Sequence, residues 1–143
     1  MSTRGRIAIV LSEGGILSNW IGHDAYIEGV GAWLDKFVTS HEQALKLIVG
    51  GGEICSLYCD KVGNPQVEYY DDVSQGDRWK AYANEQQLID DYESNVFMEY
   101  VYLFKDGAWF VYCRHYDEFV ELKQVLEEIG REYETRSMNE KFN

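Results

Sequence analysis

Apolar and polar positions near the N-terminus predict two adjacent strands. In residues 4–11 apolar side chains occupy both alternating faces, isoleucine and leucine on one and alanine and valine on the other. A strand that is apolar on both faces favours a central position in a sheet. The Ser-Glu-Gly-Gly run at 12–15 suits a tight turn, because glycine tolerates positive φ. Residues 16–20 then predict a return strand and complete a hairpin.

A second hairpin is predicted nearer the C-terminus. Residues 95–104 and 108–113 are rich in β-branched and aromatic side chains, which favour strands. The Asp106-Gly107 pair between them is typical of a short hairpin turn. Weaker extended patterns lie at 54–58 and at 67–70, and we interpret the latter as an edge strand.

Four segments carry apolar residues at helical spacing. Residues 28–38 and 39–49 predict two consecutive helices, the second opened by a threonine and a glutamate with capping-box spacing and closed by three glycines. Residues 84–92 predict a short helix and residues 117–134 a longer C-terminal one. Together the elements predict an α+β fold in two layers. An antiparallel sheet from two hairpins packs against an αα-hairpin and a C-terminal helix.

The length of 143 residues suits one domain, and a composition of 45% hydrophobic and 15% aromatic residues is that of a globular chain. We place the α+β domain at 1–135 and expect the polar residues 136–143 to form a flexible tail. The apolar run at 7–11 is too short for a signal peptide or a membrane-spanning helix. Three cysteines are an odd number, which favours a reducing cytoplasm over a secreted disulfide framework.

The formal net charge is −12, from 13 basic and 25 acidic residues. Such a chain repels the phosphates of nucleic acids and anionic membranes, so we expect neither direct nucleic-acid binding nor membrane binding. An acidic surface instead suits a partner protein with a basic surface. The simpler interpretation of the same charge is that it maintains solubility.

The cysteine and histidine residues are candidate metal ligands and candidate nucleophiles. Cys55 and Cys59 have a spacing found in zinc sites, and the further ligands would have to come from Cys113, His115 or His23. No second closely spaced pair follows, so buried reduced cysteines are the simpler interpretation. Cys113 and His115 share one face of a predicted strand, but a nucleophilic pair also needs hydrogen-bond contact and an orienting group. We therefore predict no catalytic residue, no metal and no cofactor, and lean against an enzyme.

The loop after the second strand is the first candidate binding region. Loops held by a rigid scaffold often carry function. The candidate binding residues here are His23, Asp24, Tyr26 and Glu28. A structural role remains open for Asp24, which also suits a helix cap or a turn.

Acidic doublets and aromatic strands supply the other candidates. Adjacent carboxylates on a helix point apart, so doublets suit a solvated surface or an acidic docking patch better than acid–base catalysis. The second hairpin is crowded with aromatic rings, which anchor binding when exposed and pair across strands when buried. The candidate residues from these two groups are Asp71, Asp72, Tyr100, Tyr102, Trp109 and Tyr112.

Several of these motifs resemble a family of small accessory proteins carried by bacteriophages, prophages and plasmids, a family without an assigned activity. Its members share a Thr-Arg-leading strand, an Asp-x-Tyr-x-Glu-Gly-Val-Gly loop and helix start, and a tyrosine strand followed by a tryptophan strand and a final helix. The matching segments are 2–4, 7–9, 24–31, 52–57, 100–104, 106–109 and 119–122. The chain departs from the family at Gly22, His23 and Ala25, where the family has histidine, tryptophan and glycine.

The resemblance implies an accessory protein that binds and inhibits a host or anti-phage defence protein, in the manner of anti-CRISPR or anti-restriction proteins. The alternative is a small-molecule binding protein, for example for a nucleotide, or an enzyme that uses the loop of His23, Asp24 and Tyr26. A self-assembling structural component is a third hypothesis, and the sequence is compatible with a homodimer. No P-loop or other phosphate-binding pattern is present, which counts against the nucleotide alternative.

Overall fold

A computed structural model describes residues 2–70 and 79–142, with side chains as far as Met138. The candidates Asp71 and Asp72 lie outside these residues. Within them, eight strands form one sheet. The strands are β1 (Gly5–Val10), β2 (Ile16–Ile21), β3 (Ile54–Cys59), β4 (Pro65–Tyr69), β5 (Trp79–Tyr82), β6 (Tyr100–Lys105), β7 (Ala108–Cys113) and β8 (Val120–Glu121). The helices are η1 (Ile27–Gly31), α1 (Ala32–Phe37), α2 (His41–Val49), α3 (Glu85–Ser94) and α4 (Leu122–Phe142).

The α+β class and the two predicted hairpins are confirmed. Strands β1 and β2 pair antiparallel, as do β6 and β7. The two hairpins join through a parallel pairing of β1 with β6, so β1 is central, as its two apolar faces predicted. The outer edge of β2 is divided, because β5 pairs with its first four residues and β3 meets it at Ile21.

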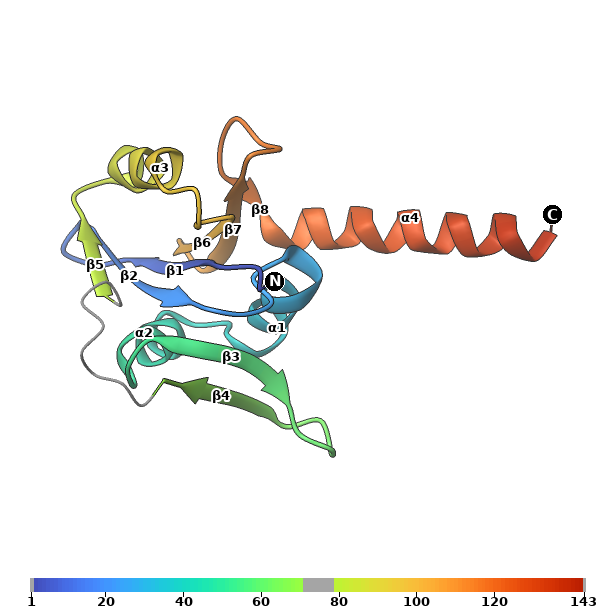
Figure 1. Cartoon of the computed structure of the whole chain (residues 1–143), viewed down its shortest axis with the longest axis horizontal. Helices are drawn as coiled ribbons and strands as arrows, with labels where there is room; N and C mark the ends of the chain where they lie inside the picture. The colour runs from blue at the N-terminus through green and yellow to red at the C-terminus, as the bar shows by residue number, and fades with distance from the viewer. Residues whose placement is uncertain (1, 71–78, 143) are drawn as a thin grey trace.

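Both faces of the sheet are covered, so the prediction of two layers is wrong. One face carries the larger hydrophobic core, which the first helices and the start of α4 close. Helix α3 lies on the opposite face, where Leu88 and Tyr92 pack with Ala8 of β1 and Leu103 of β6 (Figure 1). A central strand with apolar side chains on both faces requires cover on both sides, and α3 supplies the second layer.

The ends of the elements differ from the pattern at several points. The first predicted helix opens as one π-helical turn, η1, before α1. The cap of α2 is Ser40, whose hydroxyl accepts from the Gln43 amide, one residue later than the predicted cap. Residues 120–121 form β8 before α4 begins, and α4 continues through the predicted tail to Phe142. Figure 1 shows its second half projecting away from the body of the molecule.

Candidate functional site

A groove of about 810 Å³ lies where β1 and β6 begin and β7 ends. One wall is the N-terminal segment at Ser2 and Arg4. A second wall is the end of α3 with the loop 95–99, and a third is formed by residues 113–115. The floor includes Tyr100 and Tyr92. Burial raises the pKa of Tyr92 to about 12, so its phenol stays neutral.

Two apolar side chains stand exposed at the rim of this groove. Val96 is 86% exposed and Phe97 is 62% exposed, although most of the other aromatic rings of the chain are buried or half-buried. We call these two residues the tip. Contiguous exposed apolar side chains beside a concave surface are typical of an interaction site.

The tip is held in a defined turn. Asn95 accepts the Phe97 amide on its side-chain oxygen at 3.0 Å and the Met98 amide on its backbone carbonyl at 3.1 Å. The next residue, Glu99, donates its amide to the Arg4 carbonyl at 2.9 Å. Met98 is buried below the turn. Hydrogen bonds on both sides therefore fix the backbone that presents the tip.

The charges around the groove are balanced. The Arg4 guanidinium lies over the Phe97 ring, 5.9 Å from its centroid, a cation–π contact. Arg114 adds a second positive charge, and Glu93 and Glu99 contribute two negative ones. Glu93 accepts a hydrogen bond of 3.1 Å from the Tyr112 hydroxyl. The groove is thus close to neutral on a chain whose net charge is −12.

The predicted binding loop lies beside the groove. The Ala25 amide donates to the Thr3 carbonyl at 3.1 Å, so the N-terminal segment runs between the loop and the tip. Asp24 has a positive φ of 58° and its carbonyl accepts from Val30, so its structural role is that of a turn residue. Asp24, Tyr26 and Glu28 are exposed and remain accessible.

His23 belongs to a small cluster with Cys55 and Tyr70. Its Nδ1 lies 3.0 Å from the Cys55 carbonyl, 3.7 Å from the Cys55 Sγ and 3.4 Å from the Tyr70 hydroxyl. Because a carbonyl only accepts, Nδ1 carries the proton and cannot take one from the thiol. Burial raises the pKa of Cys55, and it raises that of Tyr70 to about 12. The cluster therefore lacks an activated nucleophile.

The predicted binding role is wrong for three of the four aromatic candidates of the second hairpin, because they are buried. Tyr102, Trp109 and Tyr112 are core residues, so their rings are closed to a partner. They pack in the two cores because both faces of this hairpin are covered by helices or strands. Tyr100, which is half-buried at the groove, is the one of these four that a partner can reach.

The structure does not bring the other candidate nucleophiles and metal ligands together. Strand β7 ends at Cys113, so His115 follows in a turn and does not share a strand face with it. Among the described residues, no three His, Cys, Asp or Glu side chains are placed to hold one metal ion. Within the same residues, no helix is long and apolar enough to cross a membrane.

Sequence reasoning missed two groups of residues. The tip fell within a predicted strand, and the signal that would have placed it in a turn is Asn95, a residue that often accepts nearby backbone amides. Arg6 was assigned to a strand but not to the interior, where it is only 2% exposed.

Comparison with known proteins gives no relative. No protein-family model matches the chain, and neither a curated protein sequence nor a solved structure shows a significant match.

Proposed function

We propose that this chain is a phage-type accessory protein of the bacterial cytoplasm that binds and inhibits a host or anti-phage defence protein. The main support for this proposal is the tip, a pair of apolar side chains exposed on a hydrogen-bonded turn beside a groove. The family resemblance supplies the biological setting of the proposal.

Burying the tip is the source of binding free energy in this proposal. An aromatic side chain that enters a partner's pocket removes apolar surface from water, at about 25 cal/mol per Å². The turn is already fixed, so little conformational entropy is lost on docking. Aromatic side chains and arginine are enriched at protein interfaces, and arginine is also enriched among the residues that dominate binding energy.

In this proposal the acidic charge attracts the partner, whereas the tip makes the contact. Because the groove is nearly neutral, a partner with a basic surface is attracted by the rest of the chain and docks on the tip. Complementary charge chiefly raises the association rate and makes it depend on salt. A protein that mimics DNA would instead place its carboxylates in a phosphate-binding groove of the partner. Its binding should then weaken strongly as salt increases.

A site-specific cross-link tests the proposal. A photoreactive amino acid at position 97, in tagged protein expressed in phage-susceptible bacteria, should give one dominant adduct that mass spectrometry identifies. The matched control places it at Val62, an 81% exposed valine in the β3–β4 turn. The proposal holds if the adduct forms from position 97 and if Phe97→Ser abolishes co-purification of the same protein while Val62→Ser does not.

The groove also bears on the small-molecule alternative. Its volume falls within the range of small-ligand sites, and Arg4 and Arg114 lie on its walls. A thermal-shift screen with nucleotides decides between the two. A ligand-dependent rise in Tm that Arg114→Ala removes would favour the alternative, and an unchanged Tm with all nucleotides supports the protein-binding proposal.

A further inference from the structure

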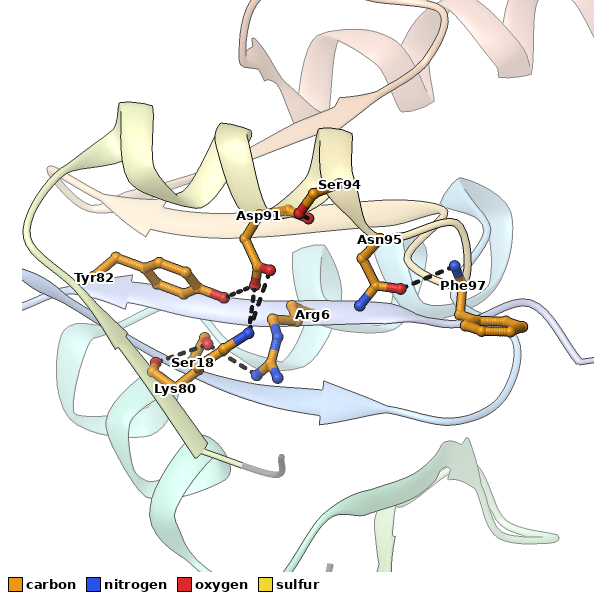
Figure 2. A network of polar contacts seen from close by, with 8 residues as sticks. All are labelled: Arg6, Ser18, Lys80, Tyr82, Asp91, Ser94, Asn95 and Phe97. Atoms are coloured by element: carbon orange, nitrogen blue, oxygen red, sulfur yellow. Dashed lines mark hydrogen bonds and ion pairs between the residues drawn. The ribbon is translucent and has the colours of Figure 1, made fainter. Parts of the chain in front are cut away.

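A polar network, buried at Arg6 and Ser18 and open to solvent at Lys80, connects α3 to the sheet on the side of the smaller core. Arg6 of β1 donates from Nη1 to the Ser18 hydroxyl of β2 at 3.1 Å, and this hydroxyl donates to the Lys80 carbonyl of β5 at 2.9 Å. Asp91 of α3 accepts from the Tyr82 hydroxyl at 2.5 Å and forms an ion pair with Lys80 Nζ at 3.2 Å. Figure 2 shows Asp91 pointing from α3 down to the two β5 side chains.

Asp91 is the residue through which α3 joins this network. Its side chain is only 17% exposed. Burial alone would raise its pKa, but the bonds from Tyr82 and Lys80 and the nearby charge of Arg6 hold the pKa below its ordinary value. The half-buried carboxylate is therefore favoured in its ionised form by the groups that bind it.

The tip follows the last turn of α3, and only residues 92–95 separate it from Asp91. The Asp91 carbonyl accepts from the Ser94 hydroxyl at 3.0 Å, and the Tyr92 carbonyl accepts from the Asn95 amide at 3.2 Å. Asn95 then forms the turn that carries Phe97 (Figure 2). The last turn of α3 consequently directs the tip from one side, while the bond from the Glu99 amide to the Arg4 carbonyl holds it from the other.

Apolar packing alone does not fix that direction. Leu88 and Tyr92 press α3 onto the sheet, but hydrophobic contact is non-directional. Directional bonds restrict rotation of the helix about its axis. Glu85 and Glu93 bind Lys105 and Tyr112 of the β6–β7 hairpin, and Asp91 is the carboxylate that binds Tyr82 and Lys80 of β5.

We infer that Asp91 is a positioning residue for the Val96–Phe97 tip, acting through α3 and its bonds to β5. The inference rests on the proposed function for its biological meaning, because it names what holds the proposed contact surface in place. In this inference Asp91 acts through α3 and not by contact with the partner.

Amide hydrogen exchange tests the inference without a partner. The reporters are the amides of Phe97 and Met98, both bonded to Asn95. In Asp91→Asn we expect their protection to fall at least tenfold, while the amides of β1 and β6 exchange as in the wild type. The matched control is Asp90→Asn, since Asp90 is the adjacent, exposed carboxylate and bonds only within α3 to Gln86 in the described contacts.

Two results would overturn the inference. Unchanged protection at Phe97 and Met98 would mean that the tip is positioned without Asp91, and a uniform loss across β1 and β6 would mean that Asp91 acts on global stability alone. If Asp91→Asn does not fold, Tyr82→Phe removes one bond to the same carboxylate and should give a smaller, still selective loss. The exchange result is independent of the cross-link at position 97, so failure of the inference and failure of the proposed function are distinguishable.

Discussion

The Tyr102 hydroxyl donates a hydrogen bond of 2.6 Å to the backbone carbonyl of Ala25, 77 residues earlier in the chain. Both residues are fully buried. The bond ties the loop that carries His23, Asp24 and Tyr26 to strand β6, whose first residue lines the groove. A side chain predicted as a binding anchor thus acts in the core, where it fixes the loop beside the candidate site.

Removing this hydroxyl should destabilise the fold. In Tyr102→Phe the Ala25 carbonyl loses a buried donor, and we expect the free energy of unfolding to fall by roughly 1–3 kcal/mol. Urea denaturation followed by tryptophan fluorescence measures the change. Tyr133→Phe, at an exposed position of α4, is the control and should stay within about 0.5 kcal/mol. Equal stability of the two variants would contradict the prediction.

Asn19 should be a second, larger determinant of stability. It is fully buried, and its Nδ2 donates to the carbonyls of Ile48 and Gly52, which secures the end of α2 at the divided edge of β2. Asn19→Ala removes both donors and should lower the free energy of unfolding by roughly 2–4 kcal/mol. Denaturant midpoints measure the loss, with the exposed position in Gln124→Ala as the neutral reference. If Asn19→Ala lowers the free energy of unfolding no more than Gln124→Ala does, these two hydrogen bonds do not contribute to stability.

Stability should decline in acid partly through Asp91. Its folded-state pKa lies below the ordinary value of an aspartate carboxyl, because Tyr82 and Lys80 bind the ionised form. A carboxylate with a depressed pKa contributes stability above its unfolded pKa and loses that contribution as the pH falls through the folded value. The difference in stability between the wild type and Asp91→Asn should therefore be constant above about pH 5 and shrink below about pH 4. Denaturation curves from pH 7 to pH 2.5 measure it, and a constant gap throughout would be the contrary result.

The three thiols should differ in reactivity. Cys59 is exposed, Cys55 is half-buried and Cys113 is buried, and burial raises the pKa of both Cys55 and Cys113. Because the thiolate is the reactive form, alkylation at pH 8 should modify Cys59 first and Cys113 last. Peptide mass spectrometry over a time course gives the order. Faster labelling of Cys55 than of Cys59 would instead indicate an activated thiol beside His23.

Local sequence patterns predicted most of the elements but not how they meet. Alternation found the two hairpins, and helical spacing with glycine stops found α2 and the start of α3, because these signals depend on neighbours along the chain. The same local pattern predicts a strand from residue 95, whereas β6 begins at Tyr100. The reason is that Asn95 accepts the amides of Phe97 and Met98 and so forms a turn. Of the residues that line the groove, Tyr100 was predicted, and the predicted loop of His23 lies beside the groove.

Composition and periodicity by themselves therefore determined the α+β class, the central place of β1 and the acidic character of the chain. Only the tertiary structure decided that β1 pairs with β6, that α3 covers the second face, that Arg6 is buried and that Phe97 is exposed. The physical reason is that periodicity records which side chains avoid water, whereas pairing and exposure depend on which distant segment fills the space beside them. The tip is exposed because α3 and the N-terminal segment hold its turn at the rim of the groove, a relation between segments that no local pattern encodes.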